Sequence, residues 1–226
     1  MNGVYECGGC IMNIISLNIG KPKKVIFNGN EVETAFYKGP VQNEVFLTKL
    51  NFEGDGQADL VNHGGLDKAV CVYPYEHYSY WEKELNRTLP NAAFGENLTV
   101  MGMLESNVHI GDIFKIGDAI VQLSQPRQPC YKIAGRHDVK DLMMHVQKTG
   151  FTGYYFRVLE EGKVSPDSSI VRLSIHPARV TVAESNEVMY EDINNQDTMQ
   201  KLLAIVELSE SWRGRFEKRL KKLKTF

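Results

Sequence analysis

The 226-residue sequence contains no long apolar run and no segment that resembles an export signal. A membrane-spanning helix needs about 18 or more consecutive apolar residues, and no stretch of this chain approaches that length. The N-terminal residues also lack the basic-then-apolar layout of a secretory signal peptide. We therefore expect a cytoplasmic protein that has no contact with a membrane.

Cysteine is scarce and widely scattered, with four residues in the whole chain. So few cysteines do not make a disulfide framework at this length, and their spacing does not match a ferredoxin-type iron–sulfur cluster. The Cys7-x-x-Cys10 pair is half of a zinc site and precedes a strand rather than a helix, so we assign it no function. The histidines show no HxxxH pattern, which argues against a classical zinc site.

The motifs of three large enzyme classes are also missing. The chain has no GxGxxG, no P-loop and no GxSxG, which argues against a Rossmann protein, a nucleoside triphosphatase and an α/β hydrolase. Its glycine-rich segment, 53–68, instead contains the turn Asn62-His63-Gly64-Gly65 followed by Lys68. Backbone N–H groups in such a turn can face an anion. His63 either contacts a ligand there or caps a strand end, and the sequence leaves both open.

What is present is the composition of a globular protein, with 42% hydrophobic and 24% charged residues. Short strand-like segments separated by turn residues continue from 12 to 178, which is typical of a β barrel or sandwich. Three helical segments follow, opening with a Thr181-x-x-Glu184 capping box. We therefore predict a mostly β (α+β) fold with a detached extension (1–11), a barrel-like domain (12–178) and a three-helix module (179–226). Strands are predicted at 14–17, 24–27, 31–36, 44–50, 68–73, 97–100, 112–116, 119–123, 154–160 and 169–175, and barrel-domain helices at 74–85 and 138–149.

The most informative residue is Cys130, which follows Pro126 and Pro129 in a stiff, extended segment. Arg127 and Lys132 flank it, and nearby cations favour the thiolate, the form that attacks electrophiles or binds soft metals. The alternative is a buried cysteine that fills a gap in the core. The setting favours chemistry, whereas Cys71, in an alternating apolar strand, is interpreted as a core residue.

Two cationic features have alternative interpretations. Arg157 lies on an otherwise apolar strand, where it needs either a carboxylate partner or a bound phosphate. From Arg213 onward, seven Lys or Arg residues against Glu217 give a net charge of +6, which leaves −8 on the preceding residues. This basic end is either a solvated helix face, which we favour, or a surface for an acidic protein or nucleic acid.

Several short strings stand out along the chain, among them Asn62-His63-Gly64-Gly65, Ser124-Gln125-Pro126-Arg127 and Pro129-Cys130-Tyr131-Lys132. Together they resemble the MOSC family, named for the C-terminal domain of molybdenum-cofactor sulfurase. The resemblance runs from about Ser16 to Phe226 and is stronger toward the stand-alone, YiiM-type bacterial members, which append a three-helix module. The shared strings are Gly20-Lys21-Pro22, Glu53-Gly54-Asp55, Asn62-His63-Gly64-Gly65, Cys71-x-Tyr73-Pro74-x-Glu76-His77-Tyr78, Phe94-Gly95-Glu96-Asn97-Leu98, Glu105-Ser106-Asn107, Gly111-Asp112-Ile113-Phe114, Ser124-Gln125-Pro126-Arg127 and Pro129-Cys130-Tyr131-Lys132.

The resemblance implies a barrel-like domain that binds the molybdenum cofactor, a pterin dithiolene carrying Mo and a phosphate. Cys130 aligns with the cysteine taken to be the protein ligand to Mo, so it is both the metal ligand and the catalytic residue in this interpretation. A thiolate is a suitably soft ligand. The residues that we assign to the pterin and its phosphate are Lys21, Asn62, His63, Gly64, Lys68, Arg127, Lys132 and Arg157.

YiiM-type proteins are associated with reduction of N-hydroxylated bases, such as 6-hydroxylaminopurine, to their amines. This resemblance therefore implies a molybdenum-dependent reductase. The chain carries no flavin, haem or iron–sulfur motif, so an external reductase must supply electrons. The main alternative is a cofactor or sulfur carrier that uses Cys130 without turnover. A DNA-associated protein that uses the basic end ranks third, so nucleic acid is not an expected partner.

Overall fold

The computed structural model describes residues 12–27, 29–58 and 64–223 of the chain. Cys7, Cys10, Asn62 and His63, which the sequence analysis considered, lie outside these residues. Among the described residues, no helix has both the length and the apolar character that crossing a membrane requires.

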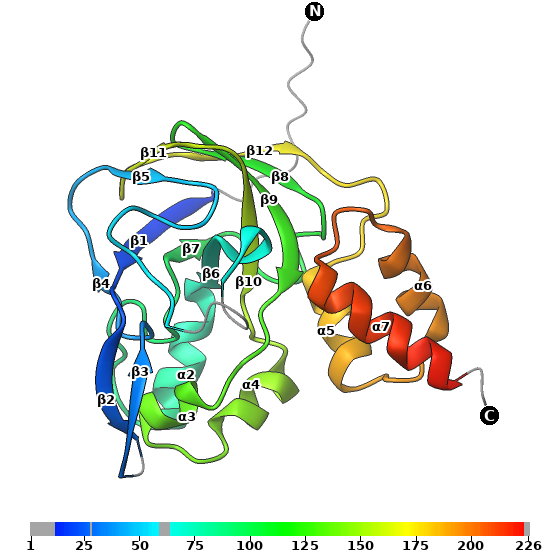
Figure 1. The fold of residues 1–226 in the computed structure, drawn as a ribbon, viewed down its shortest axis with the longest axis horizontal. Helices are drawn as coiled ribbons and strands as arrows, with labels where there is room; N and C mark the ends of the chain where they lie inside the picture. Colours follow the sequence, from blue (N-terminus) through cyan, green and yellow to red (C-terminus); the bar gives the residue numbers. More distant parts are fainter. Residues whose placement is uncertain (1–11, 28, 59–63, 224–226) are drawn as a thin grey trace, which may run out of the picture.

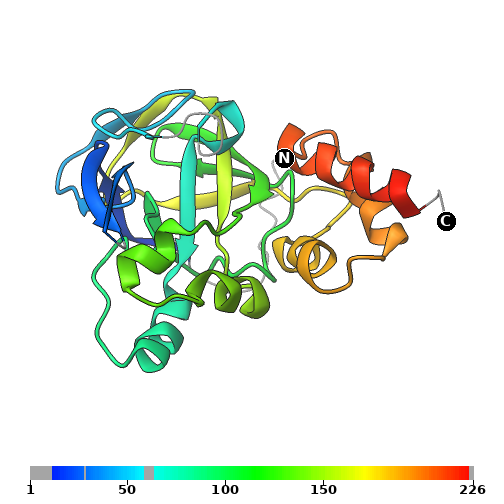
Figure 2. The same cartoon turned by 60° about the horizontal axis from the view of Figure 1, so that its bottom comes forward.

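A single curled sheet forms the body of the protein (Figures 1 and 2). Its eight strands follow the order β12-β8-β9-β10-β6-β7-β1-β4, and every neighbouring pair is antiparallel except β6 and β7. Two small sheets, β11-β5 and β2-β3, complete it. The strands are β1 (Asn13–Ile19), β2 (Lys23–Phe27), β3 (Asn30–Thr34), β4 (Gly39–Pro40), β5 (Val45–Leu47), β6 (Val70–Pro74), β7 (Leu98–Met101), β8 (Ile113–Ile116), β9 (Ala119–Pro126), β10 (Tyr154–Glu160), β11 (Gly162–Val164) and β12 (Ile170–Ser174).

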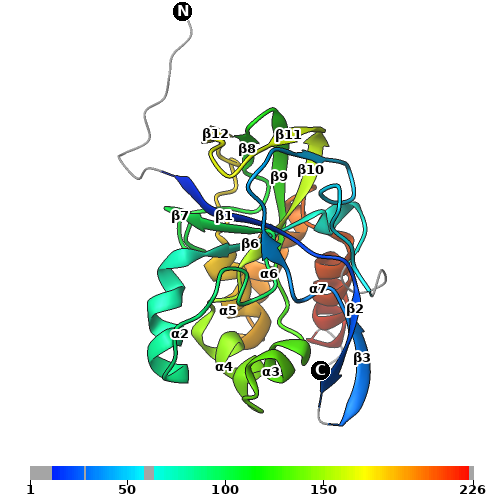
Figure 3. The same cartoon turned by 90° about the vertical axis from the view of Figure 1, so that its left-hand side faces the viewer.

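The described residues form six α-helices, in two groups of three. Helices α2, α3 and α4 gather at one end, next to the β2–β3 hairpin (Figure 3), whereas α5, α6 and α7 lie together on one side. The mostly β barrel-like fold with three C-terminal helices is therefore confirmed. The helices are α2 (Tyr78–Leu85), α3 (Lys132–His137), α4 (Leu142–Thr149), α5 (Val182–Tyr190), α6 (Gln196–Ala204) and α7 (Glu210–Leu223), with short 3-10 turns η1 (Leu66–Lys68) and η2 (Tyr75–His77).

The C-terminal helices share a hydrophobic core with the sheet. On α7, Trp212 and Phe216 are fully buried and belong to the same cluster as Phe114 and Phe156 of the strands. The capping box at the start of α5 is confirmed, since Glu184 N–H donates to Thr181 Oγ1 at 3.0 Å and Thr181 N–H donates back to Glu184 Oε2 at 2.7 Å. The three helices are thus packed on the barrel rather than tethered to it.

The start of α7 is also bonded to β9. Ser209 N–H donates to Ser124 O at 3.0 Å, and Ser211 Oγ donates to Gln125 Oε1 at 3.1 Å. Ser124 and Gln125 are fully buried near the end of β9. The helical module therefore fixes the strand that leads into the Cys130 segment.

The segment after Cys130 differs from its prediction. Residues Lys132–His137 form α3, which is too short to show a helical period in the sequence. Asp138, the first residue of the helix predicted at 138–149, has a left-handed conformation (φ 54°) and ends α3, and α4 begins only at Leu142. The aromatic ring of Phe27, on the β2–β3 hairpin, packs against Gly135, where a Cβ would approach the ring to 2.7 Å.

His137, at the end of α3, makes folding stability depend on pH. It is buried, its Nε2 lies 2.8 Å from Ala93 O and its Nδ1 lies 2.8 Å from Arg87 Nη2. Burial is the main cause that lowers the pKa of His137 to about 4, and Arg87 and Arg136 contribute in the same direction. Because the unfolded chain binds the proton first, the free energy of unfolding falls as pH drops from the unfolded pKa of about 6.5 toward 4, by up to about 3 kcal/mol.

Urea unfolding of wild type and His137→Gln at pH 7, 5.5 and 4 measures this effect. Glutamine can donate to Ala93 O and accept from Arg87 without titrating. As pH falls, the unfolding free energy of wild type should decrease more than that of the variant. A difference that stays constant across this range would show that His137 does not titrate as described.

Candidate functional site

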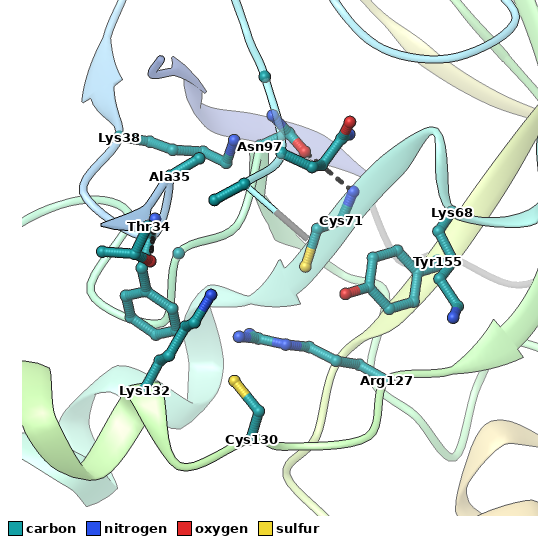
Figure 4. Close-up of a pocket in the computed structure, with 15 residues that line it drawn as sticks. Thr34, Ala35, Lys38, Lys68, Cys71, Asn97, Arg127, Cys130, Lys132 and Tyr155 are labelled. Carbon is teal, nitrogen blue, oxygen red and sulfur yellow. Dashed lines mark hydrogen bonds between the residues drawn. The ribbon is translucent and has the colours of Figure 1, made fainter. Parts of the chain in front are cut away.

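A cavity of about 550 Å³, including the space at its open mouth, lies where β9 ends and the Cys130 segment begins. Elements far apart in the sequence form its walls: the end of β3, strand β6, the entry to β7, strand β10 and the start of α3. Figure 4 shows the cationic and thiol groups converging on this space. The lining residues are Thr34, Ala35, Phe36, Lys38, Gly56, Gln57, Ala58, Lys68, Cys71, Gly95, Asn97, Arg127, Cys130, Lys132 and Tyr155.

Cys130 is a free, half-buried thiol at the cavity wall. Strand β9 ends at Pro126, and the chain then runs without regular structure to α3. The Cys130 carbonyl accepts a hydrogen bond from Ile133 N–H at 3.1 Å, so its backbone is fixed against the first turn of this helix. In Figure 4 the thiol lies beside the Arg127 side chain, at the edge of the space between the two cysteines.

Arg127 brings a buried positive charge into the cavity. Its side chain lies over the Phe36 ring, 5.6 Å from the centroid, and the residue is only 6% exposed. Within the described residues, the guanidinium takes part in none of the ion pairs. Burial opposes its charge, and the attraction from Cys71 and Tyr155 that raises the pKa of Arg127 acts only at alkaline pH, where those two groups are ionised. Such a cation is stable in a buried place when an anion faces it.

Three lysines add to the positive charge of the cavity. Lys132 is 9% exposed, and its Nζ donates to the Glu33 carbonyl at 3.5 Å. Lys38 is held by the buried carboxylate of Asp55, while Lys68 lies at the opposite side of Cys71 (Figure 4). Among the described lining residues there is no Asp or Glu. The cavity is therefore built for an anion.

A second thiol, Cys71, faces the same cavity, although the sequence placed it only in the core. Its N–H donates to Asn97 Oδ1 at 3.1 Å, and Asn97 Nδ2 donates to Asp55 Oδ2 at 2.8 Å. The Tyr155 side chain lines the cavity beside Cys71. Burial raises the pKa of the Cys71 thiol, so at neutral pH it stays protonated while the more exposed Cys130 is reached from the cavity mouth.

Asp55 links several of these groups. Its Oδ1 accepts from Gly20 N–H at 2.8 Å and from Lys38 Nζ, and its Oδ2 accepts from Asn97. Asp55 thereby fixes Lys38 on one wall and Asn97 on another. Asp55 and Asn97 lay in strings that the sequence analysis singled out, but nothing in those strings indicated that they meet.

The structure brings four of the predicted site residues together: Cys130, Arg127, Lys132 and Lys68 all line the cavity. The others lie elsewhere or are not described. Lys21 is exposed on the segment before β2, and Asn62 and His63 fall outside the described residues. Gly64 lines a neighbouring surface depression, which Lys68 also borders.

Arg157 lies in that same depression, outside the cavity. Its Nη2 and Nε donate to Asp67 Oδ1 at 2.6 and 3.0 Å, and its Nη1 donates to Gln122 Oε1 at 3.2 Å. Arg157 thus has a carboxylate partner within the chain. Of the two alternatives that the sequence left open, a salt bridge or a bound phosphate, the structure shows the salt bridge.

Comparison with known proteins identifies the family. The MOSC domain matches residues 59–171, and the YiiM-like, 3-alpha helix domain matches residues 180–223. The uncharacterized protein YflK of Bacillus subtilis is 52% identical over 211 residues, which cover 93% of this chain and 96% of YflK. The chain belongs to the MOSC-domain family.

Other MOSC relatives agree with this assignment. Protein YiiM of Escherichia coli is 41% identical over 189 residues, which cover 82% of this chain and 84% of YiiM. The crystal structure of YiiM from Geobacillus stearothermophilus matches with a TM-score of 0.80 at 39% identity, over 92% of this chain and 99% of that one. A protein named Reductase from Gibberella moniliformis is 34% identical over 70% of this MOSC chain, which corresponds to 28% of that longer protein.

Proposed function

We propose that this protein binds the molybdenum cofactor in the cavity, with the Cys130 thiolate as the protein ligand to Mo, and reduces N-hydroxylated compounds to their amines. The observation that carries the proposal is the buried Arg127 guanidinium, which lies beside the half-buried Cys130 thiol without an ion-pair partner among the described residues. The MOSC match and the relative named Reductase support it.

The residues present fit such a cofactor. The group is anionic through its phosphate and dithiolene, and the described cavity lining has four cationic side chains and no carboxylate. A thiolate is the ligand type that a soft or high-valent metal takes from a protein. A buried cation without a partner is destabilising by itself, and a bound anion removes that cost.

Each residue has a definite part in this proposal. Cys130 holds the metal, Arg127 and Lys132 neutralise the negative charge of the cofactor, and Asp55 keeps Lys38 directed at the same space. The cofactor, when bound, supplies the two-electron exchange with the hydroxylated nitrogen. The neutral polar side chains of the described lining that remain to orient a substrate are Thr34, Gln57, Asn97 and Tyr155.

The experiment is a measurement of Mo and pterin in wild-type protein produced in a cofactor-competent, molybdate-fed host. We expect near-stoichiometric amounts of both, and conversion of 6-hydroxylaminopurine to adenine with a chemical reductant. Negligible Mo, in a preparation where a known molybdoenzyme from the same host is loaded, would contradict cofactor binding. Full Mo occupancy without reduction of any hydroxylamine, amidoxime or N-hydroxylated base would contradict the reductase activity alone.

A second candidate function is a carrier that holds cofactor or persulfide sulfur on Cys130 without turnover. The exposed side of the Cys130 thiol suits a transfer role as well. Cyanide-releasable sulfane sulfur on the purified protein, together with little Mo, would favour this alternative.

A further inference from the structure

Helix α7 has two faces of different chemistry. Trp212, Phe216 and Leu220 recur at helical spacing and are buried against the barrel and its neighbouring helices. Arg215, Lys218 and Lys222 recur on another side of the helix and are exposed. The apolar face explains why the helix folds here, but packing does not explain why Arg215, Lys218 and Lys222 gather on one side of it.

The cationic face borders a groove of about 720 Å³, including its open side, against the end of α5. Its lining residues are Met189, Arg215, Lys218, Arg219 and Lys222, and none of them is acidic. The Arg219 guanidinium is fixed on the groove wall, because Nη1 donates to Val188 O at 2.7 Å and Nη2 to Met189 O at 3.2 Å. Burial and the neighbouring charge of Arg215 lower the pKa of Arg219.

These cations have no anionic partner in the described part of the chain. No ion pair between residues 12 and 223, leaving aside the positions that the structure does not describe, involves Arg215, Lys218 or Lys222. Surface cations are commonly interspersed with carboxylates, whereas this groove concentrates like charges. An anionic surface placed against it would relieve their mutual repulsion.

The groove is next to the Cys130 segment. Tyr190, the last residue of α5, lies against Gln128, two residues before Cys130, and is within electrostatic reach of Arg215. The start of α7 is bonded to Ser124 and Gln125 of β9, the strand that leads into this segment. A protein bound in the groove would therefore lie on the helices that support the Cys130 segment.

The charge distribution favours an acidic protein over nucleic acid as the occupant. The residues before Arg213 carry a net charge of −8, which repels an extended polyanion on either side of the groove. From Arg215 to Lys222 the helix rises about 10 Å, which matches a small acidic patch on a folded protein. A small patch of this kind gives fast, orientated and salt-sensitive association.

We propose that the groove formed by Arg215, Lys218, Arg219 and Lys222 is the docking surface for an acidic electron-donor protein that serves the Cys130 cavity. This inference deepens the proposed function and rests on it for the direction of electron flow. The docking itself needs only the described cations and an acidic partner, so it can be tested without the cofactor.

The test uses a flavodoxin, a small acidic flavoprotein, as the probe and cofactor-free protein as the target. Three exposed cations are reversed together in Arg215→Glu, Lys218→Glu, Lys222→Glu, and Arg219 is kept because it bonds to α5. The matched control reverses three exposed lysines elsewhere, Lys115, Lys140 and Lys201, and has the same net charge. Calorimetric Kd values are measured at 50 mM and 500 mM salt, where screening differs strongly.

We expect the groove variant to bind flavodoxin at least tenfold more weakly than the control at 50 mM salt, and this difference to vanish at 500 mM. Equal binding by both variants, or no binding by wild type, would overturn the docking surface. Preferential displacement of flavodoxin by a 20-base-pair DNA duplex at 150 mM salt would also overturn it, in favour of nucleic acid. If flavodoxin binds as expected but protein produced in the molybdate-fed host contains no Mo, the proposed function is contradicted and the docking surface is still supported.

With loaded protein, flavodoxin-dependent turnover should fall at least tenfold in the groove variant, whereas turnover with reduced methyl viologen should stay unchanged. Equal loss with both reductants would indicate damage to the cavity and contradict a docking role.

Discussion

Cys130→Ala is expected to reduce Mo occupancy at least twentyfold, from near-stoichiometric in wild type to the background of the preparation. Alanine removes the only half-exposed thiol among the described cavity residues. The Cys71 thiol that remains is buried and protonated, and the hydroxyl, amide and ammonium groups are poor soft ligands. Mass-spectrometric metal analysis and pterin fluorescence on the same samples measure the loss.

The matched control is Cys71→Ala, which removes the second thiol of the same cavity. Cys71 is buried, and burial raises the pKa of its thiol and keeps it protonated, so its loss should lower occupancy much less. Cys130→Ala should cost less than about 1 kcal/mol of unfolding free energy, because the residue is half-buried. Retention of Mo in Cys130→Ala, or equal loss in both variants, would rule out Cys130 as the specific ligand.

Arg127→Met is expected to lower cofactor occupancy at least tenfold while leaving the cofactor-free protein as stable as wild type, or more stable. Methionine keeps most of the volume and the contact with the Phe36 ring, and it removes a buried charge that lacks an ion-pair partner among the described residues. The midpoint of thermal unfolding should stay equal or rise by a few degrees.

Arg157→Met gives the opposite pattern and serves as the comparison. This arginine has its carboxylate within the chain, so replacing it leaves Asp67 unpaired and should lower stability with little effect on cofactor. Metal analysis gives the cofactor occupancy of each variant, and calorimetric melting gives its stability. A cofactor-free Arg127→Met protein that melts well below wild type would show that Arg127 serves the fold rather than an anion.

The parts of the fold set by local chemistry were predictable. The capping box at Thr181 and Glu184 satisfies its own backbone groups, so its position follows from four consecutive residues. Most strands also lie within a few residues of their predicted bounds, because alternation and turn residues are local signals. Helix α3 was missed since six residues are too few for a period to appear.

The candidate site was predictable only along one segment. Arg127, Cys130 and Lys132 are close in sequence, so their shared cavity could be expected from the order of residues alone. Cys71 and Asn97 come together because β6 and β7 are parallel neighbours, a pairing that no local pattern encodes.

The partner of Arg157 also could not be predicted from local sequence. The sequence established that this cation needs a partner, but a carboxylate and a phosphate satisfy that need equally well. The choice depends on Asp67, ninety positions away in the chain.

The hydrogen bonds from Ser209 and Ser211 to the end of β9 have a consequence for the order of events during synthesis. Residues 209–223 are translated after every barrel strand, yet they fix the strand from which the Cys130 segment departs. Until α7 has emerged and docked, Ser124 and Gln125 lack these partners. The segment that carries Cys130 therefore gains the full hydrogen-bonded support of its preceding strand only after α7 has been translated.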